Sequence, residues 1–221
     1  MLKEKVNDMR WEFMQRLISS FLFILIAVLL FSVPYKVFSV ICWGAYAIIV
    51  SEIFSSKIKG KILLRVFAAI VCFCGIWSFL YCRNISGQSQ CTLLIFISSF
   101  TDIGAYSFGK VLRGPKLCPK ISPQKTWSGF WGGILLANVA FFCLTDTVFR
   151  FPNANNGNLI VIEAVILAAV VGDLLESWFK RKIGVKDMGD LFPGHGGILD
   201  RLDSLLATSI VLAIIILYFG L

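Results

Sequence analysis

Seven apolar runs, each about as long as a lipid bilayer is thick, constrain the fold of this chain more than any other feature. They cover about residues 17–34, 37–54, 62–82, 91–109, 129–148, 158–179 and 205–221. A bilayer core of about 30 Å needs roughly 20 apolar residues in a helix, and 57% of the chain is hydrophobic while only 15% is charged. The runs are continuously apolar rather than alternating, which favours helices over a barrel. We therefore predict an all-α, polytopic integral membrane protein with about seven transmembrane helices in a single domain, residues 1–221.

The basic residues alternate between the two sides of these predicted helices. Eighteen of the 21 lysines and arginines fall on one side, and three fall on the other. Basic residues accumulate in the cytoplasmic loops of membrane proteins, so we predict a cytoplasmic N-terminus. The same distribution accounts for the net charge of +8, and we expect no nucleic-acid partner.

Two of the predicted cytoplasmic connections differ from the short outer ones. Residues 109–133 and 172–204 combine basic residues with glycines, prolines and hydroxyl side chains. Clusters of glycine and proline end helices and let the backbone approach a ligand closely. We expect a functional site where these two loops meet.

Four carboxylates lie in or beside the second of these loops. Asp173 and Glu176 are three residues apart at the end of the sixth run, and Asp200 and Asp203 repeat this spacing before the seventh. Residues three apart share a helical face, and like charges near hydrocarbon need cations. These carboxylates are either salt-bridged at helix ends or ligands of a hard divalent cation such as Mg²⁺, which prefers oxygen.

Basic residues are interleaved with these acids and glycines. Those of the two loops include Lys110, Arg113, Lys116, Lys120, Lys125, Lys180, Arg181, Lys182 and Lys186. The preference for basic cytoplasmic loops and the attraction of anionic lipid headgroups explain most of them. Their mixture with aspartates and bare backbone favours a phosphate site, because lysine, arginine and backbone amides all bind phosphate oxygens.

Two single residues are further candidates. His195, the only histidine, is flanked by small or cyclic residues that leave it exposed. It is either a turn residue or a phosphate ligand, and metal binding is disfavoured because Mg²⁺ prefers oxygen. Asp102 lies inside the fourth run, where an acid is a functional candidate. We expect Glu52 and Glu163 to be structural.

The segment SWFKRKIGVKDMGDLFPGHGGILDRLD, residues 177–203, resembles the signature of the phosphatidate cytidylyltransferases, also called CDP-diacylglycerol synthases. That pattern is Ser, two residues, Lys-Arg, four residues, Lys-Asp, then Pro-x-His-Gly-Gly, two residues and Asp-Arg-x-Asp, and every position is met. TDIGAYSFGK resembles the Asp-x-x-Ala-Tyr-x-x-Gly segment of the family, and ISPQKTWSGFWGG its Ser-Pro-x-Lys-Thr-x-x-Gly segment. Ser128 departs from the acidic residue that is usual there. The 221 residues also imply fewer N-terminal helices.

This resemblance implies Mg²⁺-dependent, in-line transfer of a cytidylyl group from CTP to phosphatidate, which yields CDP-diacylglycerol and pyrophosphate for phospholipid biosynthesis. The catalytic signature is then 172–204, with 102–133 as the supporting loop. Asp173, Asp200 and Asp203 are expected to hold Mg²⁺, and Asp102 is expected to orient a second cation or the lipid phosphate. The expected substrate contacts are Ser122, Lys125, Thr126, Lys180, Arg181, Lys186, His195, Gly196, Gly197 and Arg201.

The expected partners are therefore CTP, phosphatidate and membrane lipids, and the resemblance also allows a homodimer. We expect a bacterial inner membrane, with the active site on its cytoplasmic side.

Three alternatives remain open from the sequence. A CTP-dependent lipid kinase would release CDP, and the complete signature argues against it. A CDP-alcohol phosphotransferase is disfavoured because its Asp-Gly-x-x-Ala-Arg motif is absent. A transporter or a non-catalytic lipid-binding protein would need polar residues through the whole bilayer, whereas here they gather on one side.

Overall fold

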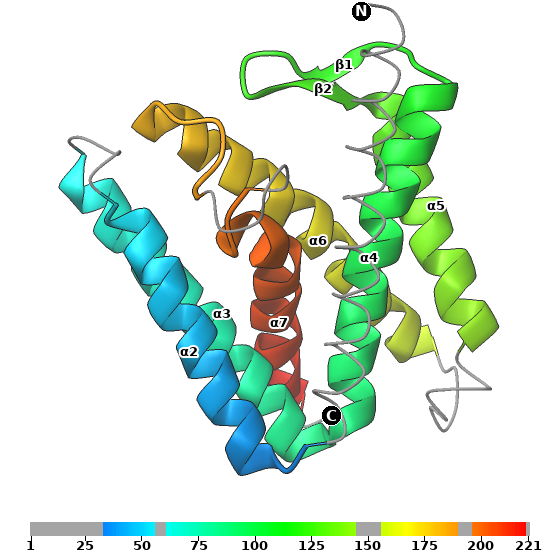
Figure 1. Cartoon of the computed structure of the whole chain (residues 1–221). Helices are drawn as coiled ribbons and strands as arrows, with labels where there is room; N and C mark the ends of the chain where they lie inside the picture. Colours follow the sequence, from blue (N-terminus) through cyan, green and yellow to red (C-terminus); the bar gives the residue numbers. More distant parts are fainter. Residues whose placement is uncertain (1–32, 56–60, 145–155, 190–195, 220–221) are drawn as a thin grey trace, which may run out of the picture.

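The computed structural model describes residues 33–55, 61–144, 156–189 and 196–219 of the chain. Within these ranges the elements are α2 (Tyr35–Ile53), α3 (Ile62–Ser86), α4 (Gln88–Val111), β1 (Lys116–Cys118), β2 (Ser122–Thr126), α5 (Trp127–Leu144), α6 (Asn156–Ile183) and α7 (Leu199–Phe219) (Figure 1). The predicted all-α membrane-protein class is confirmed. The short antiparallel hairpin β1–β2 was not predicted from the sequence.

Four helices, α2, α3, α4 and α7, are long and apolar enough to cross a membrane. They coincide closely with four of the predicted runs. The apolar part of α5, Trp127–Cys143, is shorter, and α6 contains the sixth predicted run but ends in three basic residues. The predicted run at 17–34 lies outside the described residues, so the total of seven spans and the side of the N-terminus stay predictions.

Helix α7 lies in the middle of the bundle. Figure 1 shows α2 and α3 side by side on one side of α7, and α4 and α5 on the other. The packed interior contains fully buried Ile49, Leu94, Ile97 and Ile166, which come from α2, α4 and α6. Because lipid tails are as apolar as these side chains, close van der Waals packing rather than the hydrophobic effect holds such helices together.

Many large apolar side chains point away from this interior. Leu63 is 83% exposed, Phe67 62%, Trp131 61% and Phe219 76%. Soluble proteins rarely expose apolar side chains so extensively. The outer surface therefore suits a lipid environment.

Glycines bring the backbones of α4 and α5 into direct contact. A Cβ added at Gly104 would lie 2.5 Å from the carbonyl oxygen of Gly132, and one at Gly129 would lie 2.5 Å from that of Ala105. Small residues allow this close approach between membrane helices. The contact fixes the position of Asp102 on α4 relative to the first turn of α5.

The polar connections gather at one end of the bundle. In Figure 1 the hairpin, the last turns of α6 and the first turn of α7 lie toward the same end. Arg181 on α6 donates a hydrogen bond from Nε to the carbonyl of Ile121 in the hairpin, at 3.3 Å. The two loops that the sequence singled out are therefore joined here.

Adding a methyl group at Gly104 should destabilise the protein, because the group would meet the rigid backbone of α5. Gly104→Ala is expected to lower the free energy of unfolding by about 1–3 kcal/mol, the usual cost of overpacking. Thermal unfolding of the full chain in detergent measures this loss. The matched control is Gly44→Ala on α2, where an added Cβ meets nothing within 4 Å. Equal melting temperatures for the two variants would contradict the close α4–α5 contact.

Candidate functional site

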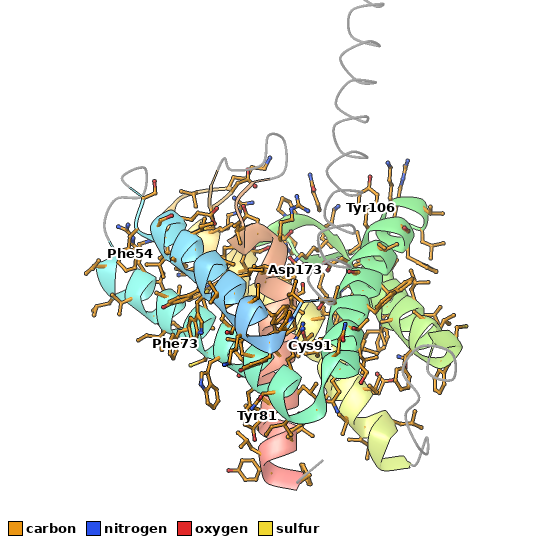
Figure 2. The ribbon with its side chains drawn as sticks, turned by 60° about the horizontal axis from the view of Figure 1, so that its bottom comes forward. Phe54, Phe73, Tyr81, Cys91, Tyr106 and Asp173 are labelled. Atoms are coloured by element: carbon orange, nitrogen blue, oxygen red, sulfur yellow. The ribbon has the colours of Figure 1, made fainter. Side chains whose placement is uncertain are left out.

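A cavity of about 490 Å³ lies where the two loops meet. Its polar lining comes from α4, the hairpin, α6 and α7, and consists of Thr101, Asp102, Tyr106, Lys110, Lys116, Ser122, Gln124, Lys125, Thr126, Asp173, Asp200 and Asp203. Figure 2 shows Asp173 among the helices of the bundle and Tyr106 toward the end of α4. The structure thus brings seven of the predicted site residues to one cavity: Asp102, Ser122, Lys125, Thr126, Asp173, Asp200 and Asp203.

An ion pair connects the hairpin to α6 across this cavity. Lys125 Nζ on β2 lies 2.7 Å from Asp173 Oδ2, and both side chains are partly exposed, at 24% and 35%. The Nζ atom of Lys125 is itself buried, so the pairing offsets the cost of removing this ammonium group from water. It also holds the lysine at the cavity.

Three carboxylates form a compact acidic group within the described part of the chain. Oxygens of Asp173, Glu176 and Asp203 all lie within 4.8 Å of one another. Glu176 is only 8% exposed, and its Oε1 has no hydrogen-bond partner among the described residues. A buried, unpaired carboxylate oxygen beside two further carboxylates is a costly arrangement without a cation. The group can hold a metal ion, and its all-oxygen donors fit Mg²⁺.

Asp200 lines the same cavity and shares the neighbour Lys180 with Glu176, but its other contacts are backbone amides of the signature loop. Its carboxylate accepts hydrogen bonds from Lys180 Nζ at 3.0 Å, from the N–H of Met188 at 3.1 Å and from the N–H of Gly197 at 2.7 Å. The bond to Gly197, three residues earlier, resembles the reach-back bond of a capping box at a helix start. These contacts hold the loop before α7. The predicted metal role of Asp200 stays a prediction, and Glu176 takes its place in the acidic group.

Lys180 is shared between two carboxylates. Its Nζ lies 2.7 Å from Glu176 Oε2 and 3.0 Å from Asp200 Oδ1, and all three side chains are largely buried. A buried cation between two anions can offset the cost of removing them from water. Lys180 therefore ties the end of α6 to the start of α7, and it is not part of the cavity lining described above.

The remaining predicted signature residues that the structure describes are not part of the cavity lining. Arg181 bonds the carbonyls of Ile121 and Val185, so it bridges the hairpin and the signature loop. Lys186 and Arg201 are exposed. Gly196 has a φ of +82°, and the amide of Gly197 is used by Asp200. His195 lies outside the described residues. Roles for these residues in substrate binding stay predictions.

Thr126 serves the start of α5 as well as the cavity. Its Oγ1 accepts a hydrogen bond from the N–H of Gly129 at 3.1 Å, the pattern of an N-cap. Ser128, where the family usually has an acid, lies with its Oγ 3.0 Å from that of Thr126 and donates a hydrogen bond to the carbonyl of Arg113. Ser128 thus links α5 to the connection between α4 and the hairpin.

Sequence reasoning missed several residues of this site. Glu176 is one of the four carboxylates that the sequence offers as salt-bridge partners or cation ligands, but the ligand set implied by the family resemblance omits it, although its spacing from Asp173 places both on one helical face. Lys110 donates a hydrogen bond to the hydroxyl of Tyr106 at 3.1 Å, and both line the cavity together with Gln124. All three residues lie in segments that resemble the family; Lys110 was also among the predicted basic residues, whereas Gln124 occupies a variable position of its segment.

Removing the carboxylate of Asp203 should abolish the stabilisation of the protein by divalent cations. At about 100 times its dissociation constant, Mg²⁺ or Mn²⁺ should stabilise the wild-type fold by about 2.7 kcal/mol. The melting temperature of the detergent-solubilised full chain, with and without the cation, measures this effect. Asp203→Asn should lose the rise, whereas Asp187→Asn, at an exposed position, should keep it. The same rise in all three proteins would show that the cation binds elsewhere.

Alanine at Gly196 should cost more stability than alanine at Gly184. Both glycines have a φ of +82°, so both substitutions carry the same backbone strain, about 1–2 kcal/mol. Only at Gly196 would the new Cβ collide with a side chain, 2.3 Å from Asp200 Oδ2, since nothing lies within 4 Å at Gly184. Denaturation of both variants in detergent measures the difference. Equal losses would mean that Asp200 is not held against this loop.

Comparison with known proteins identifies relatives of this chain. It is 45% identical over 126 residues to a phosphatidate cytidylyltransferase of Brucella suis, an alignment that covers 55% of this chain and 45% of the relative. It is 34% identical over 161 residues to a phosphatidate cytidylyltransferase of Mycobacterium bovis, covering 73% of this chain and 51% of the relative. The chain thus spans about half the length of the curated relatives that it matches.

The match to a family model is more extensive than these alignments. The model described as the Cytidylyltransferase family matches residues 5–219, which is nearly the whole chain. This protein is therefore a member of the Cytidylyltransferase family.

Proposed function

We propose that this protein is a phosphatidate cytidylyltransferase, which converts CTP and phosphatidate into CDP-diacylglycerol and pyrophosphate. The observation that carries the proposal is the cavity, where carboxylates and lysines from three distant segments meet at the polar end of an apolar bundle. One substrate is a soluble polyanion and the other is a lipid. A charged cavity at the end of membrane helices suits both, and the names of the relatives support the same activity.

The reaction needs no nucleophile from the protein. A phosphate oxygen of phosphatidate attacks the α-phosphorus of CTP and forms a new P–O bond. The bond between the α-phosphorus and the oxygen bridging to the β-phosphorus breaks, and pyrophosphate leaves with the bonding electron pair. In such transfers positioning and neutralisation of charge supply most of the catalysis.

The lysines of the cavity provide the neutralisation. Lys110, Lys116 and Lys125 line it from α4 and the hairpin, and ammonium groups bind phosphate oxygens through charge-assisted hydrogen bonds. Lys125 lies beside Asp173, so its ammonium group is already held at the cavity before a nucleotide arrives. Ser122 and Thr126 add hydroxyl donors from the same strand.

The acidic group supplies a site for a divalent cation. Asp173, Glu176 and Asp203 would hold Mg²⁺, and Asp200 and Asp102 extend the carboxylate lining toward a second cation or the lipid phosphate. When bound, Mg²⁺ would neutralise charge on the phosphates of CTP. Asp200 and Lys180 keep the ends of α6 and α7 together, and so keep the carboxylates of both helices at one place.

The other residues of the signature have supporting roles in this proposal. Arg181 holds the hairpin to the signature loop through the carbonyl of Ile121. Lys186, His195 and Arg201 belong to the matched signature, and we assign them to phosphate binding. Gly196 and Gly197 permit the tight loop before α7.

The proposed location is the inner membrane of a bacterium, with the cavity facing the cytoplasm, where CTP is made. The bacterial relatives and the concentration of basic residues on one side support this location. We retain the homodimer and the single domain over residues 1–221 as predictions from the sequence.

The full chain, purified in detergent and supplied with labelled CTP, phosphatidate and Mg²⁺, should form CDP-diacylglycerol and pyrophosphate in equal amounts. Activity should disappear when a chelator removes the cation. Lys125→Met should lower kcat by at least about 100-fold, as loss of a group that stabilises transition-state charge does. Lys120→Met is the matched control, because Lys120 is exposed in the hairpin turn and should leave kcat unchanged.

Product analysis separates this proposal from its nearest alternative. Release of CDP together with phosphorylation of a lipid alcohol would identify a lipid kinase instead. Failure to consume CTP with any of these lipids would contradict the proposed activity.

A further inference from the structure

Glu52 is a buried carboxylate that contacts the signature loop from far away in the sequence. It lies near the end of α2 and is 8% exposed. Its Oε1 accepts a hydrogen bond from the N–H of Ile198 at 2.8 Å, across 146 residues of sequence, and its Oε2 accepts one from Leu199 at 3.1 Å. Both carboxylate oxygens are therefore engaged by consecutive backbone amides of this loop.

The loop is shaped to receive this side chain. A Cβ added at Gly189 would lie 2.7 Å from Glu52 Oε1, and one added at Gly197 would lie 2.5 Å from the same oxygen. No real Cβ tolerates such a distance. Glycine at these two positions lets the backbone close around the carboxylate from both sides.

Glu52 also acts on the start of α7 electrostatically. The first amides of a helix have no partner within the helix, and a negative charge is favourable beside them. Leu199 is the first residue of α7, so Glu52 supplies both acceptor oxygens and charge at this helix end. Asp200 bonds the N–H groups of Met188 and Gly197 in the same loop. Two carboxylates, Glu52 from α2 and Asp200 from the first turn of α7, hold this segment.

We propose that Glu52 is a positioning residue for the carboxylates of the cavity. By fixing the first turn of α7, it sets the direction in which Asp200 and Asp203 leave the helix, and thereby places Asp203 beside Asp173 and Glu176. The catalytic consequence of this role rests on the proposed function, whereas the positioning itself does not. Glu52 thus connects α2, which lies outside the signature, to the chemistry of the site.

Hydrogen exchange tests the positioning directly. In Glu52→Ala, the amides of Ile198 and Leu199 lose their acceptors and should exchange at least about tenfold faster, equivalent to about 1.4 kcal/mol. Glu52→Gln keeps one carbonyl acceptor, so its effect should be intermediate. Glu163→Gln makes the same chemical change at an exposed position on α6 and should leave these amides unchanged. Unaltered exchange in Glu52→Ala, or an equal increase in every helix, would overturn the proposal.

The cation requirement tests the consequence for the site. If Glu52 places Asp203, Glu52→Ala should need about ten times more Mg²⁺ for half-maximal activity, with the KM for phosphatidate unchanged. The shift should be smaller in Glu52→Gln and absent in Glu163→Gln. A lower kcat with an unchanged Mg²⁺ requirement would mean that Glu52 only stabilises the fold, and would overturn the proposal.

Two further outcomes are distinguishable. If Glu52→Ala does not accumulate in membranes, Glu52→Gln carries the same comparisons, because it differs from the wild type by a single group. If the wild-type chain shows no cytidylyl transfer, the proposed function fails. Exchange at Ile198 and Leu199, together with the affinity for Mn²⁺ measured by the paramagnetic resonance of the free ion, then decides the positioning role alone.

Discussion

The architecture of the polar end depends on one shared cation. Lys180 lies between Glu176 and Asp200, within 3.0 Å of an oxygen of each. Charges this deeply buried persist only when they are paired, since leaving either carboxylate alone would cost several kcal/mol. The lysine therefore holds α6 and α7 together at the level where their other carboxylates approach one another. Close packing of the two helices acts at the same end of the bundle, where a Cβ added at Gly172 would lie 2.5 Å from the Cβ of Ala207.

The hairpin completes the cavity by a second set of long-range contacts. Lys125 on β2 reaches Asp173, and Arg181 reaches the carbonyl of Ile121 in the turn before β2, so the hairpin is attached to α6 at two places. Thr126 ends the strand and caps α5. A five-residue strand has little stability of its own, and these contacts with the helices give it a defined position. The basic lining of the cavity follows from this attachment.

Much of the fold was accessible from the sequence, because apolar runs of bilayer length leave few alternatives to helices. The spacing of Asp173 and Glu176 predicts that both lie on one face of a helix. It does not predict which face of α7 they meet, because that depends on how the helices pack. The hairpin was not predictable, because its strands are too short to show the alternation of apolar and polar residues that indicates a β-strand. The sequence predicts only a structural role for Glu52. Its contact with the signature loop spans 146 residues, so no local sequence pattern indicates it. Asp102 was predictable because it is an acid inside an apolar run, Lys125 because it lies in a basic loop that matches a family segment, and Asp203 because its segment is dense in charge.

The close contact between α4 and α5 limits which residues can be substituted on that side of the cavity. Where backbones touch, no side chain separates the helices, and so changing residue size there cannot widen or narrow the space beside Asp102. Changes of side-chain size that leave the helices in place are therefore expected on the hairpin side, at positions such as Gln124, an exposed residue that lines the cavity. Among such proteins, residues on the α4–α5 side of the cavity should accordingly vary little, whereas residues on the hairpin side should vary more.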